Sequence, residues 1–218
     1  MPPVPTATIR TQLEVPLRFG DGYATAARVF SFHGLVDGRE HVAFGLGDRV
    51  APLTCTSGNS SRAPLVRPHS ECLTGDVFGS ERCDCGPQLR EAVERISESG
   101  GFLLYLRQEG RGIGLYSKLD AYALQDAGLD TYEANRALGH REDERCYLVA
   151  AQMLRALGVS RVELLSNNPD KARQLRRFGI TVTAQVPTGV HLSSANARYL
   201  ATKAGSGAHT LDIPLSAA

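Results

Sequence analysis

The stretch CGPQLREAVERISESGGFLLYL, residues 85–106, predicts a helix that is followed directly by a buried strand. Apolar residues recur at helical spacing over residues 89–96, and Pro87 lies near the first turn. The glycine pair 100–101 closes the helix, and the next five residues are an apolar run. A helix joined to a buried strand is a unit of α/β architecture.

On the N-terminal side of this unit, residues 12–47 predict short strands. Apolar stretches such as 27–32 and 41–44 are separated by turn residues around Gly20 and Asp37, which is typical of antiparallel pairing. Residues 48–62 are rich in Ser, Thr, Gly and Asn, and they predict a surface loop or a flexible insertion.

On the C-terminal side, helices and strands alternate. Helices are expected at about 114–126 and 144–157 and after Asn167, and the strands are expected at 161–165 and 180–186. The expected fold is therefore α/β, a mixed sheet with a strand-rich antiparallel N-terminal part and an alternating β/α second half. We expect one domain over residues 1–218, with a core at about 12–203 and a flexible tail from about 204.

The composition restricts the class of partner. The chain has 218 residues, 24 Lys and Arg against 23 Asp and Glu, so no basic excess indicates nucleic-acid binding. No apolar run approaches the roughly 20 residues of a membrane span, and the first residues lack a signal-peptide pattern. We expect a cytoplasmic protein without nucleic-acid or membrane partners. In that reducing compartment, the five cysteines are expected to be thiols or metal ligands rather than disulfides.

Three of the cysteines, Cys72, Cys83 and Cys85, have the spacing C-x10-C-x-C. Clustered thiolates suit Zn²⁺, which is held by four protein ligands in structural sites and by three in catalytic sites. A structural site would take its fourth ligand from His69, Cys55 or Cys146, whereas a catalytic site would keep a position for water. A third alternative is that the three cysteines belong to the core without a metal.

Three polar segments could contact a phosphate group or another polar ligand. Residues 108–114, which contain Arg111, lie between a strand and a helix, where backbone N–H groups attract phosphate; the alternative is a tight turn. Residues 67–71 combine a cation, a hydroxyl and a carboxylate, and the alternative there is a solvated turn. Residues 139–145 carry acids at the expected start of a helix, where they would complement the helix dipole.

Taken together, five segments of this sequence closely resemble GTP cyclohydrolase II. They are HSECLTGD (69–76), RCDCG (82–86), RQEGRGIGL (107–115), DTYEAN (130–135) and DER (143–145). The resemblance covers about residues 12–203. It implies a hydrolase that converts GTP to 2,5-diamino-6-ribosylamino-4(3H)-pyrimidinone 5′-phosphate, formate and pyrophosphate, the first step of riboflavin biosynthesis. It also implies a homodimer that uses one Zn²⁺ per chain and Mg²⁺ with the triphosphate.

The resemblance assigns roles to residues of this chain. It implies that Cys72, Cys83 and Cys85 hold zinc, which activates water against C8 of guanine and favours the catalytic alternative. The implied catalytic residues are Asp143 as proton acceptor, Arg145 as nucleophile on the α-phosphate, and Tyr122 near the zinc-bound water. The implied GTP-binding residues are Arg67, Pro68, His69, Ser70, Glu71, Gln88, Glu109, Gly110, Arg111, Thr131, Ser166 and Lys171.

Two of these roles have alternatives. A guanidinium has a pKa above about 12 and no free lone pair near neutral pH, so Arg145 could instead be an electrostatic clamp on the α-phosphate while water attacks. Tyr122 could orient the base or water through its hydroxyl, or it could simply be an aromatic residue on the buried face of a helix.

The sequence departs from the family pattern at Glu81, at Ser166 and in its C-terminal tail. Ser166 keeps the hydroxyl of the usual threonine, and Glu81 could be tolerated at the surface. Two other functions stay open: a paralogue that stops at the formylamino pyrimidine or serves a specialised-metabolite pathway, and a non-catalytic regulator that binds zinc and GTP.

Overall fold

The computed structural model describes residues 4–53, 62–141 and 143–192. These residues form two compact units. Unit 1 comprises residues 4–53, 62–69, 90–106 and 147–188, and unit 2 comprises 70–89, 107–141, 143–146 and 189–192. The expectation of a single domain stays a prediction.

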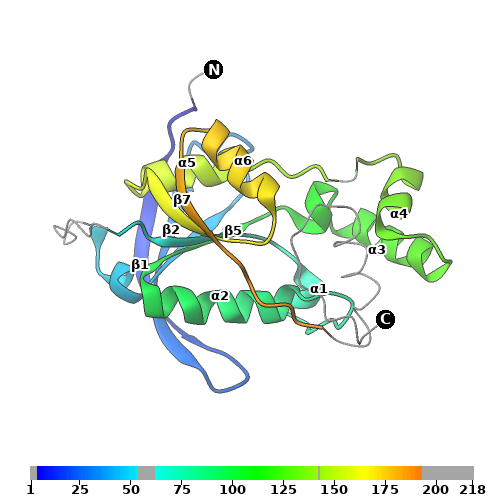
Figure 1. The fold of residues 1–218 in the computed structure, drawn as a ribbon, viewed down its shortest axis with the longest axis horizontal. Coiled ribbons are helices and arrows are strands. Elements are labelled where there is room, and N and C mark those ends of the chain that lie inside the picture. Colours follow the sequence, from blue (N-terminus) through cyan, green and yellow to red (C-terminus); the bar gives the residue numbers. More distant parts are fainter. Residues whose placement is uncertain (1–3, 54–61, 142, 193–218) are drawn as a thin grey trace. The chain divides into compact units, whose positions relative to one another are not determined.

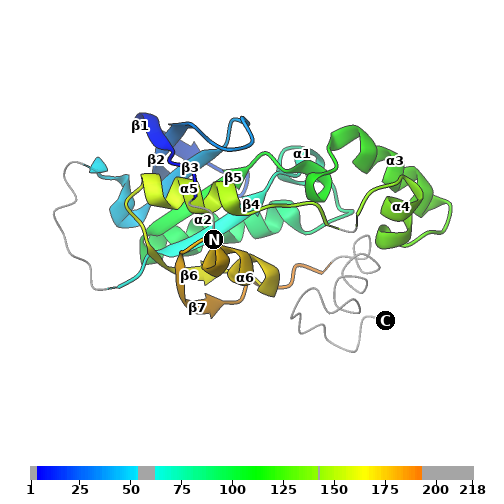
Figure 2. The same cartoon turned by 90° about the horizontal axis from the view of Figure 1, so that it is seen from above.

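A seven-stranded sheet in the order β1-β2-β3-β5-β4-β6-β7 dominates the fold. Figure 2 shows β1–β3 toward one end of the sheet and β6 and β7 toward the other. The strands are β1 Thr8–Arg18, β2 Ala24–His33, β3 Val42–Leu46, β4 Leu65–Ser70, β5 Gly101–Leu106, β6 Arg161–Leu165 and β7 Thr181–Val186. The pairs β1–β2, β2–β3 and β3–β5 are antiparallel, whereas β4–β6 and β6–β7 are parallel. The predicted mixed α/β sheet is therefore confirmed.

Helices cover both faces of this sheet, with α2 on one face and α5 and α6 on the other (Figure 1). The α-helices are α1 Leu73–Asp76, α2 Cys85–Ser99, α3 Leu115–Asp126, α4 Thr131–Ala137, α5 Leu148–Ala156 and α6 Pro169–Arg177. Two 3-10 helices are described as well, η1 Gly47–Val50 and η3 Glu109–Gly112. None of the helices in the described ranges has both the length and the apolar character needed to cross a bilayer.

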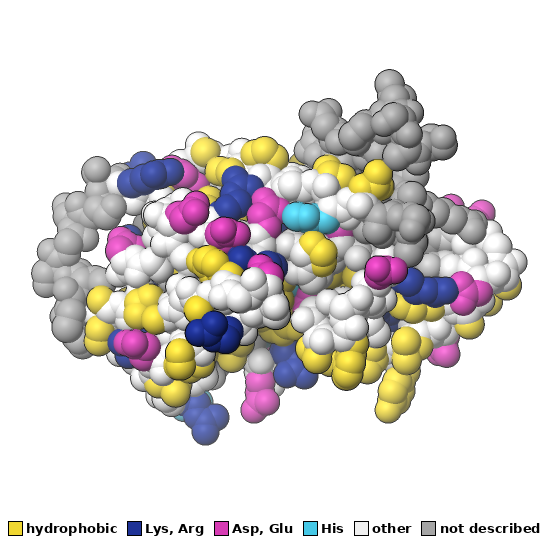
Figure 3. All heavy atoms as spheres, turned by 90° about the horizontal axis from the view of Figure 1, so that it is seen from below, with side chains coloured by type: hydrophobic (Ala, Val, Ile, Leu, Met, Phe, Trp, Pro, Cys, Tyr) yellow, Lys and Arg dark blue, Asp and Glu magenta, His cyan; other side chains and the backbone are white. Residues whose placement is uncertain are grey.

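Helix α2 follows the sequence prediction closely. Its apolar face buries Ala92, Val93 and Ile96, and it ends at Ser99. The next residue, Gly100, has a φ of +75°, which is typical of the residue that follows a helix. The exposed face carries ion pairs four residues apart, Arg90 with Glu94 and Arg95 with Glu91. Basic and acidic side chains are intermixed on the face drawn in Figure 3.

The main hydrophobic core lies entirely in unit 1. It includes the edge-to-face pair of Phe30 and Phe102, with ring centroids 6.2 Å apart, and the inner face of α5, including Met153 and Leu154. Because this core fixes the strands of the sheet, it also fixes the residues that follow their carboxyl ends.

One expectation about local structure was wrong. Helix α5 begins at Leu148 and not near Glu144, so residues 143–146 lie before the helix and form part of a loop. That loop is held in a non-helical conformation: Glu144 N donates to Arg111 O at 3.0 Å, and the Gln108 side chain donates to Cys146 O at 2.7 Å. The acidic residues there consequently do not serve a helix dipole.

For the polar segment 67–71, the structure excludes the alternative of a solvated turn. Residues 65–70 form strand β4, and Arg67, Pro68 and His69 are buried within it. A buried strand that contains a cation and an imidazole needs polar partners, because an unpaired charge is costly away from water.

Candidate metal centre and active-site residues

The three predicted metal ligands come together in unit 2. The Sγ atoms of Cys72, Cys83 and Cys85 all lie within 4.8 Å of one another, and this is the group among the described residues that could hold a metal ion. Cys72 precedes α1, Cys83 lies in the turn that follows it, and Cys85 begins α2. The local folding of residues 72–85 alone therefore assembles the cluster.

The geometry of the cluster fits a tetrahedral ion. The Sγ atoms of Cys72 and Cys83 are 3.6 Å apart. Two thiolates on a tetrahedral zinc ion, each at about 2.3 Å, are about 3.8 Å apart. The backbone of α1 packs directly on the sulfurs, since a Cβ at Gly75 would lie 2.8 Å from Cys83 Sγ and 3.1 Å from Cys72 Sγ. A side chain at position 75 would therefore displace the ligands.

Of the three thiols, Cys72 is the one whose surroundings favour the ionised form. Interactions with Cys83 and Cys85, together with the Lys118 ammonium, lower the pKa of Cys72 well below its ordinary value. The hydrogen bond to Cys72 and burial raise the pKa of Cys83 to about 11, and the pKa of Cys85 is raised as well. A metal ion that binds all three sulfurs as thiolates would therefore displace protons.

Neither described candidate for a fourth ligand, His69 or Cys146, belongs to the metal-binding group. His69 belongs to unit 1, where its ring stacks on Tyr105 with centroids 5.7 Å apart. Cys146 is an exposed thiol outside the cluster, and Cys55 lies outside the described residues. The four described cysteines are free, as expected. Glu81 is exposed, which agrees with its expected tolerance at the surface.

A lysine that the sequence reasoning did not assign contacts the cluster. Lys118 Nζ, on α3, lies 3.1 Å from Cys72 Sγ, 3.0 Å from Thr74 Oγ1 and 2.9 Å from Glu109 Oε1. Its pKa is raised because these interactions outweigh the opposing effect of burial. One signal in the sequence could have indicated that Lys118 lies near the site: it is four residues before Tyr122, so both side chains lie on the same face of α3.

Tyr122 lies beside two cations and is half-buried. Lys118 Nζ is 5.6 Å from the centroid of its ring, and Arg82 Cζ is 4.8 Å from it. Arg82 also forms an ion pair with Asp126. Tyr122 is thus neither a fully buried core residue nor fully exposed, and it lies next to the lysine that contacts Cys72.

The loop of residues 108–112 precedes α3 and has an unusual backbone. Gly110 and Arg111 both have φ of +60°, and Arg111 is the non-glycine residue with positive φ in the described part of the chain. Such a conformation costs roughly 1–2 kcal/mol for an L-residue. Arg111 places its guanidinium 5.0 Å from the Tyr132 ring, next to Thr131 at the start of α4.

Asp143 and Arg145 form a close pair. The Arg145 Nε donates to Asp143 Oδ1 at 2.9 Å, and Nη2 donates to Oδ2 at 2.5 Å. Burial alone would raise the pKa of Asp143, but the Arg145 guanidinium and backbone N–H, with Arg111 nearby, lower it overall. The pair is therefore a carboxylate and a guanidinium near neutral pH.

Two further residues of unit 2 that are predicted to bind GTP form hydrogen bonds with other side chains. Glu71 accepts from Arg107 Nε at 2.8 Å, and Gln88 Nε2 donates to Asp84 Oδ2 at 2.6 Å. The Ser70 Oγ atom is buried without a hydrogen-bond partner, so it is available to a ligand.

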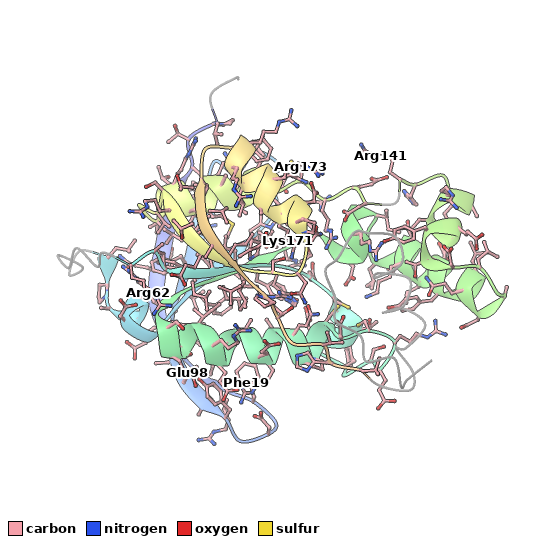
Figure 4. The ribbon with its side chains drawn as sticks, in the orientation of Figure 1. Phe19, Arg62, Glu98, Arg141, Lys171 and Arg173 are labelled. Carbon is pink, nitrogen blue, oxygen red and sulfur yellow. The ribbon has the colours of Figure 1, made fainter. Side chains whose placement is uncertain are left out.

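Unit 1 brings together another group of predicted residues, at the carboxyl ends of β4 and β6. Arg67 donates to Leu165 O at 3.3 Å, and Ser166 follows directly. Lys171, on α6, donates to Pro68 O at 2.7 Å. Figure 4 shows Lys171 and Arg173 on α6, of which Lys171 is buried whereas the Arg173 side chain is 78% exposed. Carboxyl ends of parallel strands are common ligand positions in α/β sheets.

Comparisons with known proteins find one matching family and several similar proteins. The family model described as GTP cyclohydrolase II matches residues 10–187. The protein named GTP cyclohydrolase-2 from Vibrio cholerae is 51% identical over 187 residues, 86% of this chain and 90% of that protein. The one from Psychromonas ingrahamii is 46% identical over 207 residues, 94% of this chain and 98% of that protein.

A longer relative matches as well. The riboflavin biosynthesis protein RibBA of Bacillus velezensis is 52% identical over 185 residues, 84% of this chain and 44% of that protein. The match to the family model spans most of the sheet and includes all three cysteines of the cluster. The chain belongs to the GTP cyclohydrolase II family.

Proposed function

We propose that this chain is a zinc-dependent GTP cyclohydrolase II of riboflavin biosynthesis. It would convert GTP to 2,5-diamino-6-ribosylamino-4(3H)-pyrimidinone 5′-phosphate, formate and pyrophosphate. The observation that carries the proposal is the three-cysteine cluster, whose 3.6 Å separation between two sulfurs fits tetrahedral zinc, in a chain of this family. Zinc held there would supply Lewis-acid activation of water near neutral pH.

Several of the predicted nucleotide-binding residues carry groups that suit the phosphates of GTP. Arg67, Ser166 and Lys171 in unit 1 offer two cations and a hydroxyl, which suit phosphate oxygens. In unit 2, Arg111 offers a further cation, and Thr131 is exposed in part at the start of α4. Mg²⁺ would neutralise the remaining charge of the triphosphate.

For Arg145, we favour a phosphate clamp over a nucleophile. A nucleophilic guanidinium must lose a proton, and Asp143 is the predicted acceptor. A carboxylate whose pKa is lowered by Arg145 is a weak base, so it holds the guanidinium charged rather than deprotonating it. Arg145, oriented by Asp143, would then stabilise negative charge that develops on the α-phosphate.

Other parts of the proposal rest on the sequence and the family. A homodimer, a cytoplasmic location, and the lack of nucleic-acid and membrane partners stay predictions. So does the role of Tyr122, whose hydroxyl would orient water or the base.

The first experiment incubates the protein with GTP and Mg²⁺, with and without a zinc chelator, and follows formate, pyrophosphate and the nucleotide product by mass spectrometry. We expect both small products, and we expect the chelator to suppress them. Pyrophosphate with a formyl-retaining nucleotide would indicate the paralogue that stops early, and unchanged GTP would indicate the regulator.

A matched pair of cysteine variants tests the metal ligands. Cys83→Ser should lose bound zinc and formate release, because a serine hydroxyl is a far poorer zinc ligand than a thiolate. Cys146→Ser changes an exposed thiol outside the cluster and should keep both. Full formate production by Cys83→Ser would contradict the catalytic-zinc assignment.

A further inference from the structure

The ammonium group of Lys118 is fully engaged by protein atoms. Its three N–H donors match three acceptors, which are Cys72 Sγ at 3.1 Å, Thr74 Oγ1 at 3.0 Å and Glu109 Oε1 at 2.9 Å. The residue is 8% exposed. In this arrangement Lys118 has no donor left for a nucleotide, so its partners define its role.

The Glu109 carboxylate accepts hydrogen bonds from three donors. Its Oε1 accepts from Lys118 and from Gly110 N at 3.0 Å, and its Oε2 accepts from Leu73 N at 2.7 Å. Leu73 directly follows the ligand Cys72 and begins α1. The carboxylate therefore joins the loop before α3 to the segment that carries the first cysteine.

The charges of these groups are complementary. Three thiolates around a divalent cation carry a net charge of −1, and an ammonium at 3.1 Å from one sulfur offsets it. A hydrogen bond to a thiolate withdraws electron density from the sulfur, which makes a bound metal a stronger Lewis acid. The Glu109 carboxylate holds the ammonium at that position and balances its charge.

We propose that Lys118 is a positioning residue for the metal centre, which orients the Cys72 thiolate and lowers its donor strength, and that Glu109 holds Lys118 in place. This inference rests on the proposed function in that it takes the three cysteines as metal ligands. It gives Glu109 a role in the support of the metal site in addition to its predicted contact with GTP.

The test uses variants that separate this role from simple packing. Lys118→Met alone leaves the Glu109 carboxylate buried without its cation, and this could unfold the protein. The double variant Lys118→Met/Glu109→Gln removes both charges together, and Lys118→Arg keeps the charge and the donors. Folding of each variant is checked by circular dichroism.

The first readout is zinc affinity, measured by competition with a chromophoric chelator. We expect the double variant to bind zinc about 10–100-fold more weakly than the wild type. The Cys72 sulfur would lose the group that holds it in position, and no cation would offset the net charge of −1 at the metal site, and these losses should outweigh the stronger donation by the sulfur. Lys118→Arg should recover most of the loss.

The second readout is the thiolate-to-metal charge-transfer band of the Co²⁺-substituted protein. Without the hydrogen bond, the Cys72 sulfur should donate more strongly, and the band should move to longer wavelength. A folded double variant with zinc affinity within twofold of the wild type and an unshifted cobalt band would overturn the inference.

The wild-type control separates this inference from the proposed function. Wild-type protein that binds one zinc ion but releases no formate would contradict the proposed function and leave the comparison of variants intact. Wild-type protein that binds neither zinc nor Co²⁺ would overturn both.

Discussion

At the scale of single residues, the chemistry of unit 2 depends on charged groups that hold one another in place. Asp143 holds Arg145, and Glu109 holds Lys118. The two pairs differ in burial, because the Lys118 and Glu109 side chains are each 9% exposed whereas that of Asp143 is 37% exposed. The buried pair is expected to be sensitive to loss of one partner, and the exposed pair is expected to respond to pH.

The Asp143–Arg145 pair gives a prediction about pH. The pKa of Asp143 is lower in the folded protein than in the unfolded chain, where it is about 3.9. The stabilisation by the ionised carboxylate is therefore complete above about pH 4–5 and is lost as the pH falls through the lowered pKa. Asp143→Asn should be less stable than the wild type at pH 7, by no more than about 1 kcal/mol for a partly exposed pair.

Urea denaturation of both proteins with the metal chelated, from pH 7 down to about pH 2.5, measures this difference. The difference in the free energy of unfolding should shrink as the pH falls. A difference that stays constant over this range would mean that the charge of Asp143 does not contribute to stability.

At the scale of elements, the loop of residues 108–112 connects the two chemical groups of unit 2. Through Glu109 it contacts the cysteine cluster, and through Arg111 O and Gln108 it holds residues 144 and 146. Gly112 has φ of +98°, and a Cβ there would lie 3.1 Å from the Glu144 carbonyl carbon and from its Cβ. A side chain at position 112 would therefore press on Glu144, which would have to shift by a few tenths of an ångström.

Gly112→Ala should consequently disturb the Asp143–Arg145 segment, and Gly114→Ala is its matched control. Both glycines have positive φ, +98° and +94°, so both alanines carry a similar backbone strain of roughly 1–2 kcal/mol. A Cβ at Gly114 meets no atom within 4 Å, so only Gly112→Ala should also lower pyrophosphate release strongly. Thermal denaturation and pyrophosphate assays measure the two effects; equal activity of the two variants would contradict this account.

Some helices and strands could be predicted from the sequence and others could not. The antiparallel strands of the first half and helix α2 were predictable, because their apolar periodicity matches their burial. Strand β4 was not, because its buried residues include Arg67 and His69, whose partners come from distant parts of the chain. Helix α4 was missed although Asp130 and Glu133 form a capping box, a local signal that could have revealed it.

The candidate site was predictable to a similar degree. The spacing of the cysteines was sufficient to propose the cluster, because residues 72–85 fold locally around it. Lys118 was not predicted, because a lysine on a helix is usually exposed and its contact with Cys72 spans 46 residues. The late start of α5 could not be foreseen either, since the bonds that hold residues 144 and 146 come from the loop before α3.

At the scale of the whole molecule, the two units are stabilised in different ways. The hydrophobic core cluster lies in unit 1 and contains large side chains such as Phe30, Phe102 and Leu154. Among the described residues of unit 2, the buried apolar ones are Cys72, Cys83, Ala121 and Ala134, and buried polar residues outnumber them. Unit 2 therefore gains little from apolar burial, and metal binding is expected to contribute to its folding.

Removal of the metal should therefore loosen unit 2 and leave the core of unit 1 intact. A ligand present at 100 times its dissociation constant stabilises the state that binds it by about 2.7 kcal/mol, and a chelator removes that contribution. Hydrogen exchange with and without chelator should show faster exchange in residues 72–89 and 107–126, and little change in β3, β5 and β6.

Cys146→Ser should respond like the wild type, because its thiol lies outside the cluster. Equal acceleration in both units would mean that the metal stabilises the chain as one cooperative structure, and no acceleration would mean that unit 2 is held by its polar network alone.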